Sequence, residues 1–270
     1  MSVRSRFLFV VPPMAGHVNP TLPVGRELAD RGHEVAWAGP PEVVGELMPP
    51  GATFIPVPLS DRVRDHIAAR ADDLRGAAAL KHLVGEFLVP LAECMVPGVH
   101  AAVDRFRPDA LVVDQQALAG VAVALAREVP WATSATTSAL LTDPMELIPK
   151  VKAWADGLQR DVLRGAGVDE RTAAAVDLRF SPQLVLVFST TAFVGRDDFP
   201  DHYAFVGPAI GARPDDTPFP WEWLDRPGPH VLVSLGTLNW HNGGPFFAAA
   251  AEALGGMDAS GVLVAPPELV

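Results

Sequence analysis

The chain has 270 residues, enough for one large domain or nearly two. Its 21 basic and 32 acidic residues give a formal net charge of −11, which argues against a surface that holds nucleic acid or an anionic membrane. Hydrophobic residues make up 49% of the chain, a share typical of a globular protein with a large core. The lone cysteine, Cys94, excludes an intramolecular disulfide, and no Cys/His group has zinc-site spacing. We therefore expect a soluble protein of a reducing cytoplasm, with no nucleic-acid or membrane partner.

The first sixty residues alternate between strand-like and helix-like segments. The apolar run 7–11 predicts a strand covered on both faces, and 34–39 and 52–58 predict two more. Between the first two strands, Asn19 as N-cap and Pro20 as first helical residue predict a helix. This order predicts an α/β fold built on a doubly wound, Rossmann-like parallel sheet.

The same alternation continues to residue 208. Residues 61–106 have mostly helical patterning, in which Pro90 and Pro97 predict breaks between several helices. The remaining expected elements are strands at 110–114, 184–190 and 203–208, a crossover helix at 120–129 and a strand-to-loop transition at 131–139.

A change of composition divides the chain. Residues 209–228 are dominated by Pro, Gly and Asp, so we expect a domain over 1–208, a linker over 209–228 and a second domain from 229 to 270. After the linker, the pattern predicts only one strand–helix–strand unit. A mononucleotide-binding half of a doubly wound domain needs more strands, so we expect this second domain to be incomplete.

Polar residues follow the predicted strands of the first domain at three places: His17, Asp114 and the Ser/Thr cluster 133–138. Ligands of open α/β sheets bind beyond the carboxyl ends of the strands. A carboxylate that ends a buried strand needs a partner, and a histidine from a neighbouring strand end is suitable. Such a pair can act as a general base. The alternative is that both residues are caps or turn residues.

A second candidate lies at the start of the second domain. The first βα turn of the chain has neither a dinucleotide fingerprint nor a P-loop. In the sequence Ser-Leu-Gly-Thr at 234–237, however, amide groups near Gly236 and the hydroxyl of Thr237 can bind a phosphate. An ordinary tight turn is the alternative.

Four blocks of sequence resemble the family 1 glycosyltransferases of the GT-B fold, especially the bacterial macrolide and antibiotic branch. The blocks are PPMAGHVNPTLPVGRELADRGHEVAW, PDALVVDQQALAGVAVALAREVPW, FPDHYAFVGP and HVLVSLGT. The resemblance runs from Phe7 to Val264, nearly the whole chain. It implies two Rossmann-like domains, with the acceptor bound mainly by the N-terminal one and the nucleotide sugar mainly by the C-terminal one.

The resemblance also implies roles for single residues. His17 matches the base that deprotonates the acceptor hydroxyl, and Asp114 matches its acidic partner. The reaction implied is sugar transfer with inversion from a UDP- or dTDP-sugar to a hydrophobic natural product, without a metal or other cofactor. The resemblance also implies that Gly16, Gly236 and Thr237 contact the nucleotide-sugar donor.

We expect four side chains to line the acceptor site: Met14, Thr136, Thr137 and Ser138. For Met14 the alternative is core packing, and for the Thr and Ser residues it is turn chemistry after a strand.

The family's long donor signature, a Trp-x-Pro-Gln-like start followed by His-x-Gly-x-x-Ser, has no match here. We expect it beyond Val270, so the chain alone is expected to have an incomplete donor site. An alternative hypothesis is a non-catalytic acceptor-binding or auxiliary protein that retains the N-terminal half of the fold. A third is a different α/β enzyme that binds a sugar phosphate through residues 234–237.

Overall fold

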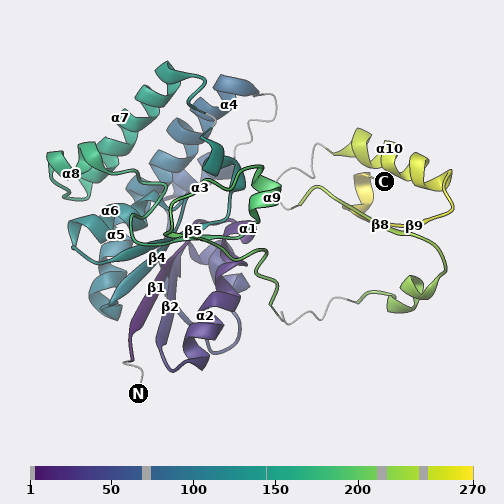
Figure 1. Ribbon diagram of the computed structural model, residues 1–270, viewed down its shortest axis with the longest axis horizontal. Helices are drawn as coiled ribbons and strands as arrows, with labels where there is room; N and C mark the ends of the chain where they lie inside the picture. The colour runs from purple at the N-terminus through teal and green to yellow at the C-terminus, as the bar shows by residue number, and fades with distance from the viewer. Residues whose placement is uncertain (1–3, 69–73, 144, 212–217, 237–242, 270) are drawn as a thin grey trace. The chain divides into compact units, whose positions relative to one another are not determined.

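The computed structural model describes residues 4–68, 74–143, 145–211, 218–236 and 243–269 (Figure 1). The chain divides into two compact units, Met1–Arg213 and Pro214–Val270. The division lies inside residues 209–228, the predicted linker. The roles of the two domains in binding acceptor and donor remain a prediction.

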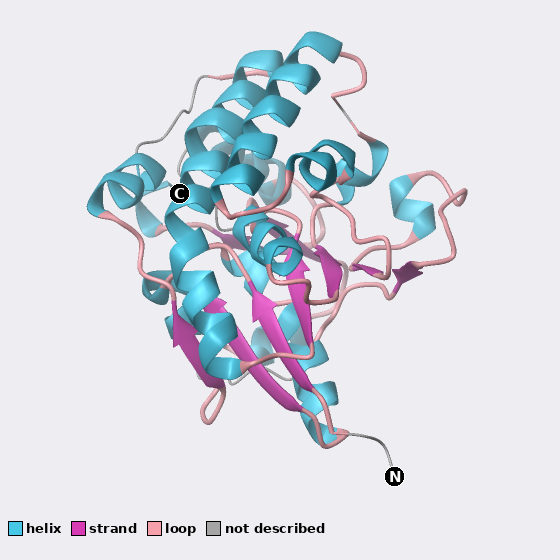
Figure 2. Cartoon of the chain, turned by 90° about the vertical axis from the view of Figure 1, so that its left-hand side faces the viewer, coloured by secondary structure: helices cyan, strands magenta, loops and turns pink. Residues whose placement is uncertain are grey.

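The larger unit is built on a single parallel sheet, which has seven strands in the described residues (Figure 2). The strands are β1 (Arg6–Val10), β2 (Glu34–Gly39), β3 (Thr53–Pro56), β4 (Ala110–Asp114), β5 (Trp131–Ala135), β6 (Val185–Val187) and β7 (Tyr203–Phe205). Their order is β3-β2-β1-β4-β5-β6-β7, which reverses between β1 and β4. The predicted α/β fold with a doubly wound parallel sheet is confirmed. The neighbouring carboxyl ends of β1 and β4 form its topological switch point, where such sheets bind ligands.

Helices cover both faces of this sheet (Figure 1). The short α1 (Ala15–Val18) leads into α2 (Thr21–Asp30), which packs on one face, while α5 (Val89–Phe106) and α6 (Leu118–Ala126) pack on the other. Outside α5 and α6 lies α7 (Pro149–Gly165). The other helices and turns of this unit are η1 (Pro41–Gly45), α3 (Asp61–Ala68), α4 (Gly76–His82), η2 (Leu83–Leu88), η3 (Ser138–Thr142), α8 (Glu170–Ala175) and α9 (Thr191–Val194).

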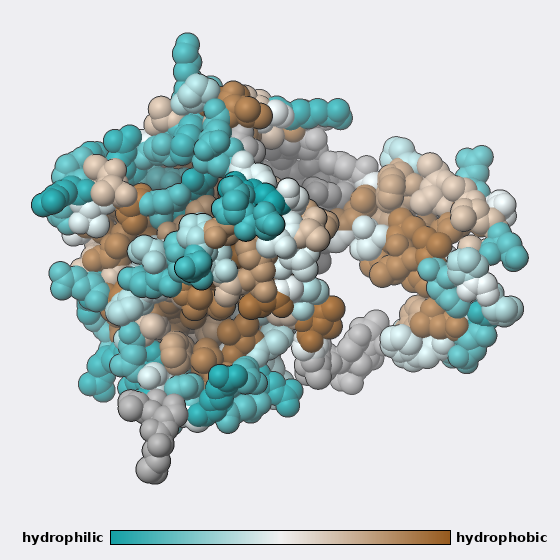
Figure 3. Space-filling view, in the orientation of Figure 1, coloured by the Kyte–Doolittle hydropathy of each residue, from teal (hydrophilic) through white to brown (hydrophobic). Residues whose placement is uncertain are grey.

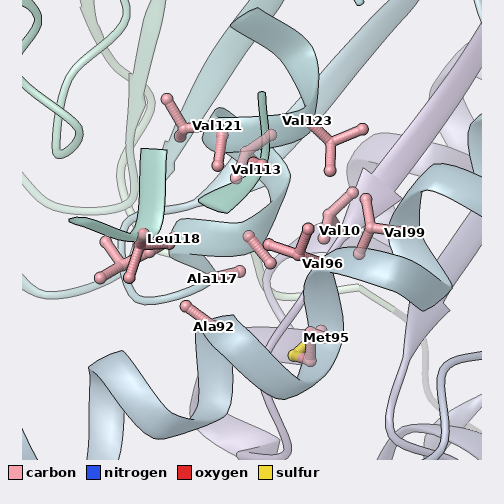
Figure 4. Close-up of a cluster of buried hydrophobic side chains, with 14 of the residues drawn as sticks. Val10, Ala92, Met95, Val96, Val99, Val113, Ala117, Leu118, Val121 and Val123 are labelled. Carbon is pink, nitrogen blue, oxygen red and sulfur yellow. The ribbon is translucent and has the colours of Figure 1, made fainter. Parts of the chain in front are cut away.

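The largest hydrophobic cluster fills the space between the sheet, α5 and α6 (Figure 4). Val10 and Val113 come from the neighbouring strands β1 and β4, and Met95 and Val99 reach them from α5. Close packing here requires a glycine in α6, because a Cβ at Gly120 would lie 2.6 Å from a methyl carbon of Val113. These contacts hold rigid the two strands whose ends carry the candidate site.

The helical region at 61–106 differs from the sequence prediction at its prolines. Pro97 lies inside α5 and does not break it, and Pro90, in the first turn of α5, does not interrupt the continuous helical stretch Gly76–Phe106. Pro97 is exposed, so water can solvate the carbonyl group that loses its partner, while the buried face of α5 keeps the helix in place.

The first helical turn also begins earlier than predicted. Asn19 ends α1, and its amide donates to the carbonyl of Ala15, so Asn19 is not the N-cap of the helix that follows. Pro20 precedes α2 and does not occupy its first position. The cause is that the loop after β1 itself folds into a helical turn.

One helical stretch, Gly76–Phe106, is long and apolar enough to cross a membrane by length and composition alone. Half of its most apolar part is buried inside the larger unit, where α5 supplies core residues. It is a core helix of this unit.

The smaller unit has the predicted strand–helix–strand arrangement. Its strands β8 (His230–Ser234) and β9 (Ser260–Val264) pair in parallel, and α10 (Gly244–Gly255) connects them. Short 3₁₀ turns, η4 (Trp221–Asp225) and η6 (Pro267–Leu269), precede and follow this arrangement. In the described part of this unit, α10 covers one face of the two-stranded sheet, and Leu232 of β8 is 71% exposed. Apolar side chains are visible at the surface of this unit (Figure 3).

Candidate active site

His17 and Asp114 meet at the switch point of the larger sheet. They are 97 residues apart in the sequence, yet Nδ1 of His17 lies 2.9 Å from Oδ1 of Asp114. Asp114 is the last residue of β4 and its side chain is fully buried, while the His17 side chain keeps 11% of its surface exposed. The structure thus brings together the two residues that the sequence indicates as a base and its partner.

Local packing explains why His17 stands at this point. Val18, the next residue in α1, is fully buried and packs with Val11 and Val44. The amide of His17 donates to the carbonyl of Met14 at 2.9 Å, which closes the turn. The imidazole is therefore held by a short, anchored turn directly beyond the end of β1.

Asp114 is surrounded by hydrogen-bond donors. Its Oδ1 accepts from the amide of Gln116 at 2.9 Å in addition to His17, and its Oδ2 accepts from the hydroxyl of Thr136 at 2.7 Å. A buried carboxylate requires such partners to remain ionised. An ionised carboxylate only accepts hydrogen bonds, so it selects the tautomer of His17 with the proton on Nδ1. In that tautomer Nε2 carries the lone pair, and no described residue forms a hydrogen bond with it.

The loops after β4 and β5 are joined by further hydrogen bonds. The amide of Thr137 donates to the side-chain oxygen of Gln115 at 3.1 Å, and the side-chain amide of Gln116 donates to the Thr137 hydroxyl at 3.4 Å. Sequence reasoning did not single out these two glutamines. The available signal was a polar pair placed directly after a strand that ends in a buried carboxylate.

The other residues of the larger unit that the sequence predicts to contact the donor or the acceptor lie in different environments. Gly16 precedes His17 in α1, and a Cβ added to it would meet nothing within 4 Å, so the space beside it is open. Met14 is only 9% exposed and offers little surface to an acceptor. The Thr136 hydroxyl faces the His–Asp pair, and Ser138 is half-buried at the start of η3.

The predicted phosphate-binding residues belong to the smaller unit. Gly236 has a φ of +69°, a conformation that favours glycine, and its amide donates to the Ser234 hydroxyl at 3.2 Å. Such a hydrogen bond is typical of an ordinary tight turn, which is the alternative to a phosphate site. Thr237 lies outside the described residues.

A separate polar cavity of about 370 Å³ lies between α7 and the segment 173–179, and neither His17 nor Asp114 lines it. Arg179 pairs there with Asp143 and Asp177, each at 2.9 Å. Burial lowers the pKa of the Arg179 guanidinium, but the hydrogen bonds and charges of the two carboxylates outweigh it and raise the pKa above the usual arginine value. These ion pairs join the loop after η3 to the chain that leads into β6. Among the described residues, no group of three or more Asp, Glu, His or Cys side chains can hold a metal ion.

Comparison with known proteins places this geometry in a family context. The chain matches no protein-family model. It is 29% identical over 262 residues to demethyllactenocin mycarosyltransferase of Streptomyces fradiae, an alignment that covers 91% of this chain and 55% of that protein. With 4'-demethylrebeccamycin synthase of Lentzea aerocolonigenes it shares 27% identity, over 87% of this chain and 63% of that protein. The solved calicheamicin glycosyltransferase CalG4 has a TM-score of 0.69 at 23% identity, over 98% of this chain and 66% of that one.

The chain is similar in sequence to these transferases of antibiotic biosynthesis, and it shares the fold of solved GT-B glycosyltransferases. It spans between 55% and 66% of the length of the three proteins just named. Because the named relatives are a transferase and a synthase, the comparisons do not favour a non-catalytic auxiliary protein. In this chain, the His17–Asp114 pair lies at the switch point of the larger sheet.

Proposed function

We propose that this chain supplies the acceptor-binding domain and the general base of an inverting glycosyltransferase. The enzyme transfers a sugar from a UDP- or dTDP-sugar to a hydroxyl group of a hydrophobic natural product, and it acts as a soluble cytoplasmic protein. The observation that carries the proposal is the buried Asp114 that holds Nδ1 of His17 at the switch point and leaves Nε2 without a hydrogen bond to any described residue. The spinosyn rhamnosyltransferase SpnG, a structural neighbour, has been solved with thymidine diphosphate and with spinosyn aglycone, which supports both substrate classes.

The chemistry follows from the state of the imidazole. Nε2 of His17 takes the proton of the acceptor hydroxyl while the hydroxyl oxygen attacks the anomeric carbon. The bond from that carbon to the diphosphate oxygen breaks, and the nucleoside diphosphate leaves with the electron pair. Attack from the face opposite the leaving group inverts the anomeric configuration. Asp114 keeps the ring in the reactive tautomer and stabilises the imidazolium that forms. No step in this scheme uses a metal ion or a further cofactor.

A transfer assay with a matched histidine control tests the role of His17. The intact glycosyltransferase that contains this chain is incubated with UDP- or dTDP-hexose and a panel of hydroxylated, apolar aglycones, and the glycosylated product is measured by mass. We expect His17→Gln to reduce turnover by a factor on the order of 10² or more. The control is His33→Gln, since His33 stands before β2 at the opposite end of the sheet and accepts from the amide of Ser5 at 3.2 Å. Equal turnover in the His17 variant and the control contradicts the proposal.

Two further measurements separate the parts of the proposal. The anomeric configuration of the product, determined by NMR, must be opposite to that of the donor, and retention would exclude direct displacement. Separate calorimetric titrations with aglycone and with nucleotide show which substrate the chain binds. Aglycone binding without nucleotide binding supports the acceptor-domain assignment, and nucleotide binding alone contradicts it.

A further inference from the structure

Thr136 is the third member of the hydrogen-bonded group at the switch point. Its hydroxyl oxygen lies 2.8 Å from Nδ1 of His17 and 2.7 Å from Oδ2 of Asp114. We propose that Thr136 is a positioning residue that holds the His–Asp pair in its reactive geometry, and that its hydroxyl is not a ligand of the acceptor. This inference rests on the proposed function, because the geometry that Thr136 holds is that of the proposed base.

The positions of the protons decide what the Thr136 hydroxyl can do. Its single proton is donated to Oδ2 of Asp114, and its lone pairs face the Nδ1–H group of His17. The Nδ1 proton thus lies between two acceptors, Oδ1 of Asp114 and Oγ1 of Thr136. The carboxylate is therefore held at both oxygens and the ring by two acceptors at Nδ1, which restricts the rotation of both groups.

The hydroxyl also matters because Asp114 is fully buried. Of the donors described around the carboxylate, His17 and the Gln116 amide both reach Oδ1, and only the Thr136 hydroxyl reaches Oδ2. Without that hydroxyl, Oδ2 is a buried charged oxygen with no described donor, an arrangement that favours rotation of the carboxylate or entry of water. Either change releases the ring of His17.

The backbone around Thr136 fixes the hydroxyl in advance. Thr136 directly follows β5, and Ser134 of that strand is in register with Asp114, so the end of β5 brings Thr136 beside Asp114. The next residue, Thr137, is held by the Gln115 side chain through its backbone amide. The loop therefore presents the hydroxyl to the pair before any substrate binds, as a preorganised site requires.

The test compares Thr136→Val, which removes the hydroxyl at nearly constant shape, with Thr136→Ser, which keeps it. Thr136→Ala removes it with less bulk, in case the valine variant does not fold. The matched control is Thr142→Val, because Thr142 is exposed, follows in the same segment and donates to the carbonyl of Ala139. The first measurement is solvent exchange of the His17 Nδ1 proton, followed by NMR on the chain labelled with ¹⁵N-histidine and assigned by its loss in His17→Gln.

We expect Thr136→Val and Thr136→Ala to accelerate exchange of this proton by at least roughly tenfold, and Thr136→Ser and Thr142→Val to leave it slow. In the transfer assay, kcat should fall by roughly tenfold or more in the hydroxyl-free variants, while KM for the acceptor stays within about twofold. A raised KM with unchanged kcat and unchanged proton exchange would show that the hydroxyl binds the acceptor. Lower stability with unchanged proton exchange would show a structural role only.

The exchange measurement needs neither donor nor acceptor. If the intact enzyme that contains the wild-type chain transfers no sugar while the exchange follows the pattern above, the proposed function fails and the assignment of Thr136 stands. If transfer depends on His17 but exchange is the same with and without the hydroxyl, the proposed function stands and the assignment of Thr136 is wrong.

Discussion

Gly25 of α2 and Gly16 of α1 are both helical glycines, but only Gly25 is enclosed. A Cβ at Gly25 would lie 2.3 Å and 2.5 Å from two carbons of the Trp37 ring, whereas a Cβ at Gly16 would meet nothing within 4 Å. Trp37 is held in place, since it stacks on Phe9 with ring centroids 5.2 Å apart and its indole N–H donates to the Thr21 hydroxyl at 3.0 Å. We therefore expect Gly25→Ala to destabilise the larger unit and Gly16→Ala to leave it intact.

The magnitude follows from the distances at Gly25. Carbon atoms pack best at about 3.5–4.0 Å, so the Trp37 ring must retreat by roughly 1 Å or more. Overpacking of this kind costs about 1–3 kcal/mol. Loss of the indole hydrogen bond adds about 1 kcal/mol, and the better helix propensity of alanine offsets up to about 1 kcal/mol. We expect Gly25→Ala to lower the free energy of unfolding by about 1–3 kcal/mol, and Gly16→Ala to raise it by at most about 1 kcal/mol.

Urea unfolding followed by tryptophan fluorescence and near-ultraviolet circular dichroism measures the difference. With an m-value of about 3 kcal/mol/M, the Gly25→Ala midpoint should fall by about 0.3–1 M. The near-ultraviolet signal should also change in the native state, because the Trp37 ring moves. A Gly25→Ala midpoint equal to or above that of the wild type would refute the reasoning, since it would mean that the helix and the ring separate without cost.

Three further predictions concern other sites. Gly16→Ala fills open space beside His17, so it should lower the transfer rate while the urea midpoint stays unchanged or rises, and an unaltered rate would show that no substrate approaches this glycine closely. Ser181 is fully buried and its hydroxyl donates to the carbonyl of Trp131 at 2.6 Å, so Ser181→Ala should destabilise the chain by about 1–3 kcal/mol in urea unfolding, and a loss below about 0.5 kcal/mol would contradict this. Asp169 caps α8, and the hydrogen bonds from Thr172 hold the pKa of its carboxyl below the usual value. The stabilisation is therefore present at neutral pH and is lost as the pH falls through this lowered pKa, so the urea midpoints of wild type and Asp169→Asn should differ at neutral pH and converge once the pH lies below that pKa. A difference that does not change with pH would contradict the assignment.

The strands could be predicted because their signal is local. β2 and β4 have the bounds that the sequence predicts, since a strand buried on both faces is a continuous apolar run bounded by polar or turn-forming residues. The helix break predicted at Pro97 was wrong because tertiary packing keeps α5 continuous. A proline breaks an isolated helix, but in α5 it stands on the exposed side while Met95 and Val99 anchor the opposite side in the core.

The candidate site divides in the same way. By itself the sequence determined that a histidine follows the first strand and that an aspartate ends a buried strand. Only the tertiary structure decided that β1 lies beside β4, which brings His17 within 2.9 Å of Asp114, and that the hydroxyl of Thr136, 119 residues from His17, joins them. Local propensity sets which segments are strands, but the order of strands in a sheet depends on how helices such as α5 and α6 bury their apolar faces on it. Contacts across about a hundred residues therefore depend on packing of the whole unit, which a single sequence pattern does not contain.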